Sequence, residues 1–78
     1  MIPKVLEVVV LNQDIPERGL RRGDLGAVVE ILQSDAFAVE FVAASGRTQA
    51  LLTLKPSDIR PVRDDDLVSV RPATAGRS

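Results

Sequence analysis

Glycines, prolines and clusters of turn-forming residues interrupt this 78-residue chain repeatedly. No window longer than ten residues keeps the 3.6-residue apolar period of an amphipathic helix. The segments between the interruptions are short and rich in valine, leucine and alanine, and several alternate apolar with polar side chains. That alternation is the period of a half-buried β-strand, so the sequence predicts an all-β domain.

Five segments fit this description. Residues 4–11, KVLEVVVL, carry apolar side chains on both faces, which predicts a strand covered on both sides. In residues 36–42 the apolar side chains of Phe37, Val39 and Phe41 alternate with smaller or charged ones, the clearest half-buried pattern in the chain. The other strands are expected at residues 25–32, 48–54 and 59–63.

Assigning one face of each strand to the core gives a set of expected core positions. In the first strand Leu6, Val8 and Val10 share one face, and Val5, Val9 and Leu11 share the other. In the second strand we expect Val28 and Ile31 inside. In the fourth strand the inward set is Thr48, Ala50, Leu52 and Leu54, and the outward set is Arg47, Gln49, Leu51 and Thr53.

The connections between the strands suggest a specific architecture. The first loop, Asn12 to Asp24, is long, and its apolar Leu20 is expected to be buried and to pin the loop to one end of the barrel. Gly46 suits a tight turn with positive φ, and residues 55–58, KPSD, suit a 3₁₀ turn capped by Ser57 or Asp58. The resulting order of a strand, a long loop, three strands joined by short turns, a 3₁₀ turn and a last strand is that of an SH3-like five-stranded barrel, which we place in residues 1–63. Residues 64–78 then form an acidic and Pro/Ala/Gly/Ser-rich tail that is partly disordered or adds a strand at residues 67–70.

Composition excludes several classes of function. Ten basic and eleven acidic residues leave a net charge of −1, so no overall field attracts the chain to nucleic acid or to an anionic membrane. The longest apolar run is far shorter than the ~20 residues of a spanning helix, and no signal-peptide pattern begins the chain. We therefore expect a cytoplasmic protein.

The sequence also lacks the residues that catalysis and metal binding need. The chain has no histidine or cysteine, and Ser34, Ser45 and Ser57 stand in no recognisable Ser/Lys pattern. We expect the acidic side chains to be solvated, both at Asp14 and Glu17 and at residues 64–66. Residues 64–66 also lack the turn glycine and the further ligands that a cation site needs. We expect no enzyme activity, cofactor or metal.

Two surface features remain as candidate contacts. Arg18, Arg21 and Arg22 could reach a nucleic acid, but three loop carboxylates balance them and no aromatic residue offers stacking, so we expect internal ion pairs instead. A proline-rich peptide would need Tyr and Trp, which the chain lacks. We therefore expect the chain to bind a protein partner or a second copy of itself. The expected interface consists of the apolar side chains left on the outside of the strands and of two flanking arginines: Val5, Val9, Leu11, Val42 and Leu51, with Arg47 and Arg60.

Three runs of the sequence resemble a known family: DIPERGLRRGDLGAVVEIL, AVEFVAASGRTQALLTL and DIRPV. Together they resemble a family of small bacterial proteins that carry a domain of unknown function, from about residue 8 to residue 62. The resemblance implies an SH3-like barrel and a partner-binding or antitoxin-like role. The fragment GLRRGDLGAVVEI is also similar to KOW-type motifs and to the barrel subunit of nitrile hydratases, which leaves two alternatives: a nucleic-acid-binding module, or an accessory subunit of an enzyme formed with another chain.

Overall fold

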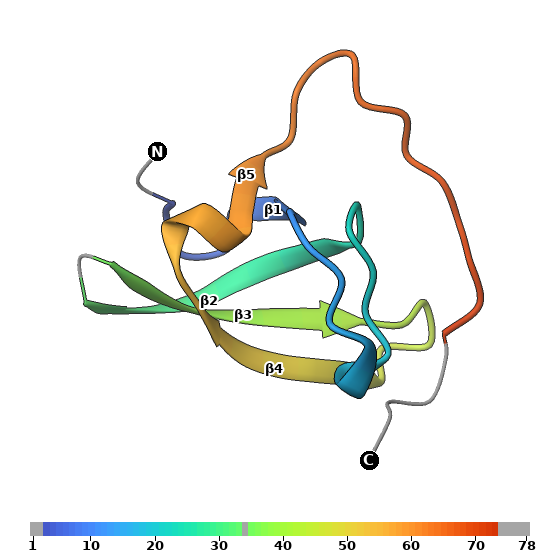
Figure 1. The fold of residues 1–78 in the computed structure, drawn as a ribbon, viewed down its shortest axis with the longest axis horizontal. Helices are drawn as coiled ribbons and strands as arrows, with labels where there is room; N and C mark the ends of the chain where they lie inside the picture. The colour runs from blue at the N-terminus through green and yellow to red at the C-terminus, as the bar shows by residue number, and fades with distance from the viewer. Residues whose placement is uncertain (1–2, 34, 74–78) are drawn as a thin grey trace.

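The computed structural model describes residues 3–33 and 35–73, and its ordered elements are strands and two short 3₁₀ turns (Figure 1). This confirms the all-β prediction. The elements in chain order are β1 (Val8–Leu11), η1 (Pro16–Arg18), β2 (Leu25–Gln33), β3 (Ala36–Val42), β4 (Thr48–Leu54), η2 (Pro56–Asp58) and β5 (Ile59–Pro61).

The five strands form one antiparallel sheet in the order β4-β3-β2-β1-β5. The last strand returns to lie beside the first, with Leu11 opposite Ile59, so the sheet curls into the small barrel that the sequence predicted. All five strands and the first loop contribute to one buried core: Val9, Leu11, Leu20, Val28, Phe37, Val39, Phe41, Ala50, Leu54 and Ile59, with Ile15 and Leu52 packed against it.

The first strand has the opposite orientation to the predicted one. Val9 and Leu11 are fully buried in the core, whereas Leu6 and Val8 are exposed. The reason is that β1 begins only at Val8, after a turn in which the Glu7 amide donates to the Lys4 carbonyl and Leu6 takes a left-handed φ of 69°. Val10, on the other face, is buried as well, as the apolar pattern on both sides suggested.

The far half of β2 leaves the barrel, and this overturns the expectation that Ile31 is buried. Val28 is fully buried as predicted, but the register shifts between Val28 and Glu30. Ile31 then lies opposite the buried Phe37, yet it is 43% exposed. Strand β1 pairs with β2 only as far as Ala27, and within the described part of the chain the residues before β1 bond to Val28 but to no later residue of β2. Ile31 therefore lies on the part of the β2–β3 hairpin that extends beyond β1 (Figure 1).

A second bulge corrects the prediction for Thr48 and Gln49. Phe41 pairs with Ala50 while Val42 pairs with Thr48, so Gln49 is the extra residue and Thr48 is turned outward. The Thr48 hydroxyl donates to Glu40 Oε2 at 2.6 Å on the outer face, and Gln49 Nε2 donates to the Arg18 carbonyl at 3.2 Å. Further along β4 the predicted inward positions are right: Ala50 and Leu54 are buried, and Leu52 is partly buried.

The loop between β1 and β2 belongs to the core, as predicted from Leu20, which is 3% exposed. The amide and carbonyl of Leu20 both bond to Ile15, and the turn η1, which the sequence did not predict, lies between these two residues. Gly19 closes η1 with a φ of 69°. The Gly23 amide then donates to the Leu11 carbonyl, so both ends of the loop are tied to the sheet.

Gly26 occupies a core-facing position of β2, opposite Val9. A Cβ atom there would lie 2.7 Å from Val39 Cγ1 and 2.8 Å from Phe41 Cε2. Both distances are shorter than van der Waals contact, so the absence of a side chain at Gly26 is what lets Phe41 pack over this strand.

After the fourth strand the 3₁₀ turn appears as predicted, with Asp58 Oδ2 accepting the Lys55 amide. Strand β5 ends at Pro61, two residues earlier than expected, and residues 62–73, here called the strap, add no strand to the sheet. The strap instead arches outward from β5 (Figure 1, orange to red) and returns to the first loop, where Arg71 bonds to Asp24. The expected frayed tail, residues 72–78, lies outside the described residues from position 74 onward.

Candidate functional site

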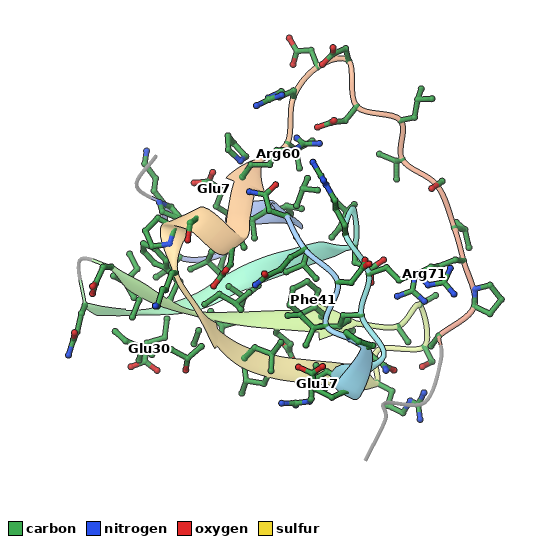
Figure 2. The ribbon with its side chains drawn as sticks, viewed as in Figure 1. Glu7, Glu17, Glu30, Phe41, Arg60 and Arg71 are labelled. Carbon is green, nitrogen blue, oxygen red and sulfur yellow. The ribbon has the colours of Figure 1, made fainter. Side chains whose placement is uncertain are left out.

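Two arginine–aspartate pairs hold the strap against the barrel. Arg60 on β5 donates two hydrogen bonds to Asp66, at 2.9 and 2.8 Å. Arg71 returns to the first loop, where it donates from Nε to Asp24 Oδ1 at 3.0 Å and from Nη2 to Asp24 Oδ2 and the Gly19 carbonyl. Figure 2 shows Arg60 and Arg71 at the two ends of the strap. These pairs are the salt bridges found among residues 3–33 and 35–73.

The two aspartates are held in their charged form. Hydrogen bonds from the Arg60 side chain and the Arg63 amide lower the pKa of Asp66 to about 2. Burial alone would raise the pKa of Asp24, but the hydrogen bonds from the Arg71 side chain and the Arg21 amide outweigh it, so the pKa of Asp24 is also lowered. Both anchors of the strap therefore persist at neutral pH.

Replacing Arg60 with glutamine should raise the pKa of Asp66 from about 2 towards its usual value of 3.8, because the main lowering hydrogen bonds are lost. A carboxyl group whose pKa is lowered by folding stabilises the folded state at pH values above its ordinary pKa. The stability that the Arg60–Asp66 anchor contributes should therefore be lost as the pH falls from about 4 through about 2. NMR titration of the Asp66 carboxyl carbon measures this shift. Arg63→Gln, which keeps the amide bond, is the matched control and should leave the pKa of Asp66 much closer to about 2.

The strap encloses an open cavity of about 850 Å³, here called the strap groove. Its floor is the outer face of the sheet, at Val10, Leu25 and Val42, and its roof is the apolar run of the strap: Leu67, Val68 and Val70. The roof residues are between 74% and 98% exposed, so the groove is open to solvent. Arg21, Arg22, Arg60 and Arg71 line it together with Asp24 and Asp66.

The loop carboxylates do not pair with the loop arginines, contrary to expectation. Asp24 accepts the Arg21 amide and Asp14 accepts the Arg22 amide, both at 2.8 Å, so each carboxylate caps the backbone. Within the described part of the chain, the guanidinium groups of Arg18, Arg21 and Arg22 take part in no ion pair. Arg21 and Arg22 line the strap groove, whereas Arg18 does not.

The predicted interface residues divide into two groups. Val5, Val42 and Leu51 are exposed, but Val9 and Leu11 belong to the core, so their assignment to an interface is wrong. Arg60 is held by Asp66, whereas the other expected flanking arginine, the exposed Arg47, forms no salt bridge with residues 3–33 or 35–73.

Outward apolar side chains nevertheless form a continuous surface across four strands. Val8 pairs with Ala27, Ala27 with Glu40, and Glu40 with Leu51, so these four side chains form one row on the outer face. Leu25 and Val42 occupy the neighbouring positions two residues along their strands. We call this surface the outer patch: Val8, Leu25, Ala27, Val42 and Leu51, with Glu40 near its centre.

The other candidate chemistries gain no support from the described residues. Among residues 3–33 and 35–73, no group of three or more acidic side chains is arranged to hold a metal ion. Ser45 Oγ accepts the Arg47 amide within its turn, and Ser34 lies outside the described residues. In the same part of the chain, no helix is long and apolar enough to cross a membrane.

A curled five-stranded antiparallel sheet with an apolar outer face and a strap defines the class as a small, β-barrel-like domain. The chain belongs to the family described as Domain of unknown function (DUF4926), which matches residues 5–61. This confirms the resemblance to a domain-of-unknown-function family. The match covers the barrel and ends where the strap begins. No curated protein and no solved structure matches the chain.

The two anchors of the strap were not predicted from the sequence. Asp24 and Arg71 are 47 residues apart, and nothing in either local sequence indicates that they meet. One signal was available: an apolar run at residues 67–70 stands between Asp66 and Arg71 in an otherwise polar tail. Charged residues that flank a short apolar run at both ends can indicate a segment fixed at both ends to the domain.

Proposed function

We propose that this protein is a non-enzymatic interaction module that binds a separate partner protein through its outer sheet face. The observation that carries this proposal is the outer patch, where apolar side chains from β1, β2, β3 and β4 lie in adjacent register and remain accessible. Single exposed aliphatic residues are common on any surface, but a continuous apolar surface is characteristic of a binding site.

The charge at the centre of the patch favours a different chain over a second copy as the partner. Glu40 is half-buried among the apolar side chains and accepts a hydrogen bond from Thr48. A two-fold interface centred on this patch would bring two Glu40 carboxylates together, which is unfavourable in a desolvated interface. A partner that offers a donor opposite Glu40 avoids this cost. The role is that of the binding half of a protein pair, which is the partner-binding or antitoxin-like role that the resemblance to a family of small bacterial proteins of unknown function implies.

Leu51→Asp should abolish capture of the partner, since it places a charge in the middle of the patch at a side chain that is 55% exposed. Tagged wild-type and variant chains are purified from the native cell, and their co-purifying proteins are compared by mass spectrometry. Leu32→Asp is the matched control, because Leu32 is similarly exposed but lies on the protruding β2–β3 hairpin. The proposal is wrong if both variants retain the same partner at the wild-type yield.

The same purification separates the alternatives. A larger enzyme that co-purifies in fixed ratio would make the chain an accessory subunit. Light scattering that shows a wild-type dimer and a Leu51→Asp monomer would make a second copy the partner. A nucleic-acid-binding role has one specific observation in its favour: the guanidinium groups of Arg18, Arg21 and Arg22 form no salt bridge within the described ranges. This role is tested together with the strap groove below.

A further inference from the structure

We infer that the strap groove binds an extended segment of a partner protein that carries acidic and aliphatic side chains. This inference rests on the proposed role as a protein-binding module and specifies the chemistry of the partner. It concerns the part of the outer face that lies beneath the strap, whereas Leu51 does not line that groove.

The first argument is the charge of the groove. Four arginines and two aspartates line it, so its lining carries a net charge of +2 in a chain whose net charge is −1. The two aspartates are already bonded to Arg60 and Arg71. The remaining cations, Arg21 and Arg22, form no salt bridge within the described residues, although the charge of Arg21 does act on Asp24. An arginine guanidinium binds a carboxylate through two parallel hydrogen bonds, so both side chains can accept a carboxylate from a partner.

The second argument is the apolar surface on both sides of the groove. Val10, Leu25 and Val42 form the floor, and the roof side chains reach 98% exposure at Val70 although the strap is fixed at both ends. An apolar run that is anchored but uncovered gains free energy when aliphatic side chains enter between roof and floor. The volume of about 850 Å³ falls within the range of about 300–1,000 Å³ that is typical of ligand-binding clefts.

The third argument is the backbone of the strap. Between its anchors, residues 67–70 donate and accept no backbone hydrogen bond with the described residues. Free amide and carbonyl groups along a strap of fixed position can pair with an extended chain, as sheet edges do when they bind a peptide. The groove therefore offers main-chain pairing, apolar contact and two cations together.

A single-stranded nucleic acid would also bring negative charge, but it fits the groove less well. Such ligands need aromatic side chains on which bases can stack, together with a track of several cations. Phe41 is the aromatic residue that lines the groove, and it is 2% exposed. Aliphatic side chains on the floor and roof match aliphatic side chains of a peptide instead.

The inference is tested with the full chain and a random heptapeptide library displayed on phage. We expect selected peptides to be enriched in Asp or Glu together with Val, Leu or Ile, and the best of them to bind in fluorescence anisotropy. Arg21→Ala/Arg22→Ala should weaken that peptide about tenfold or more, since two charge-assisted contacts are lost. Val68→Ser/Val70→Ser should also weaken it without lowering thermal stability, because both side chains are largely exposed.

Arg18→Ala/Arg47→Ala is the matched control, since it removes two exposed arginines that do not line the groove, and it should retain wild-type affinity. The inference is overturned if selection enriches no acidic peptides, if the two arginine pairs behave alike, or if a random RNA 12-mer binds through Arg21 and Arg22 in place of peptide. Leu51→Asp should leave peptide binding unchanged. Loss of partner capture and loss of peptide binding therefore report separately on the proposed function and on this inference.

Discussion

Gly26→Ala should lower the free energy of unfolding by about 1–3 kcal/mol, although it adds a single methyl group. The new Cβ would lie 2.7 Å from Val39 Cγ1 and 2.8 Å from Phe41 Cε2, and both neighbours are buried among other core residues with little room to move. The β2 backbone or the Phe41 ring must therefore shift. Urea denaturation, followed by far-ultraviolet circular dichroism, measures the loss.

A double-mutant cycle shows whether crowding is the cause. Val39→Ala removes the methyl group nearest to the new Cβ, so the double variant should be more stable than the sum of the single effects predicts, with a coupling of about 0.5–2 kcal/mol. Gly23→Ala is the contrasting control. A Cβ at Gly23 meets no atom within 4 Å, but the φ of 97° is strained for alanine, so its cost should not depend on Val39. Strict additivity of Gly26→Ala and Val39→Ala would contradict the crowding argument.

Leu20→Ala should cost about 2–5 kcal/mol of unfolding free energy, which is the range for truncating a buried core leucine to alanine. Leu20 lies in the loop between β1 and β2, yet it is 3% exposed and belongs to the same buried cluster as Val9 and Phe41. The truncation leaves a cavity at the end of the barrel. It should also speed exchange of the Leu20 amide proton, which is bonded to the Ile15 carbonyl.

Leu67→Ala is the matched control for Leu20→Ala. It makes the same truncation at a side chain that is 95% exposed on the strap, and it should change the unfolding free energy by no more than about 0.5 kcal/mol. If the two variants were equally stable, the loop would not be part of the core and Leu20 would not pin it.

The sequence predicted a strand orientation correctly where the alternation of side chains was complete. Phe37, Val39 and Phe41 alternate with much smaller or charged residues, so one orientation buries far more apolar surface than the other, and the structure shows that orientation. In β1 the run of three valines and a leucine is apolar on both faces and fixes no orientation. The turn at residues 4–7 decides it, and that turn depends on the Leu6 amide bonding to the Val28 carbonyl of a distant strand.

The imperfect alternation of residues 25–32 favours a bent or bulged second strand, and β2 does carry a bulge, but the exact positions of the bulges in β2 and β4 were beyond local prediction for a related reason. A bulge changes which side chains face the core after it, but its position depends on the register of the partner strand. Thr48 and Ile31 each lie beyond such a shift. The contacts of the candidate site were harder still to predict. Their opposite charges favour ion pairs between the loop arginines and the nearby carboxylates, whereas Asp14 and Asp24 accept hydrogen bonds from backbone amides, which carry no sequence signature.

The strap contributes no residue to the buried core, whose last member along the chain is Ile59. It is anchored by side-chain pairs, and the family match ends at residue 61, before it begins. In the proposed binding role, folding and partner choice can therefore be altered independently. The other ten of its twelve residues could be exchanged, with Asp66 and Arg71 retained as the anchoring side chains, and the barrel would display a new roof above an unchanged floor. If the strap groove binds a peptide as inferred above, the strap is the segment where evolution or an engineer can change selectivity without disturbing the core.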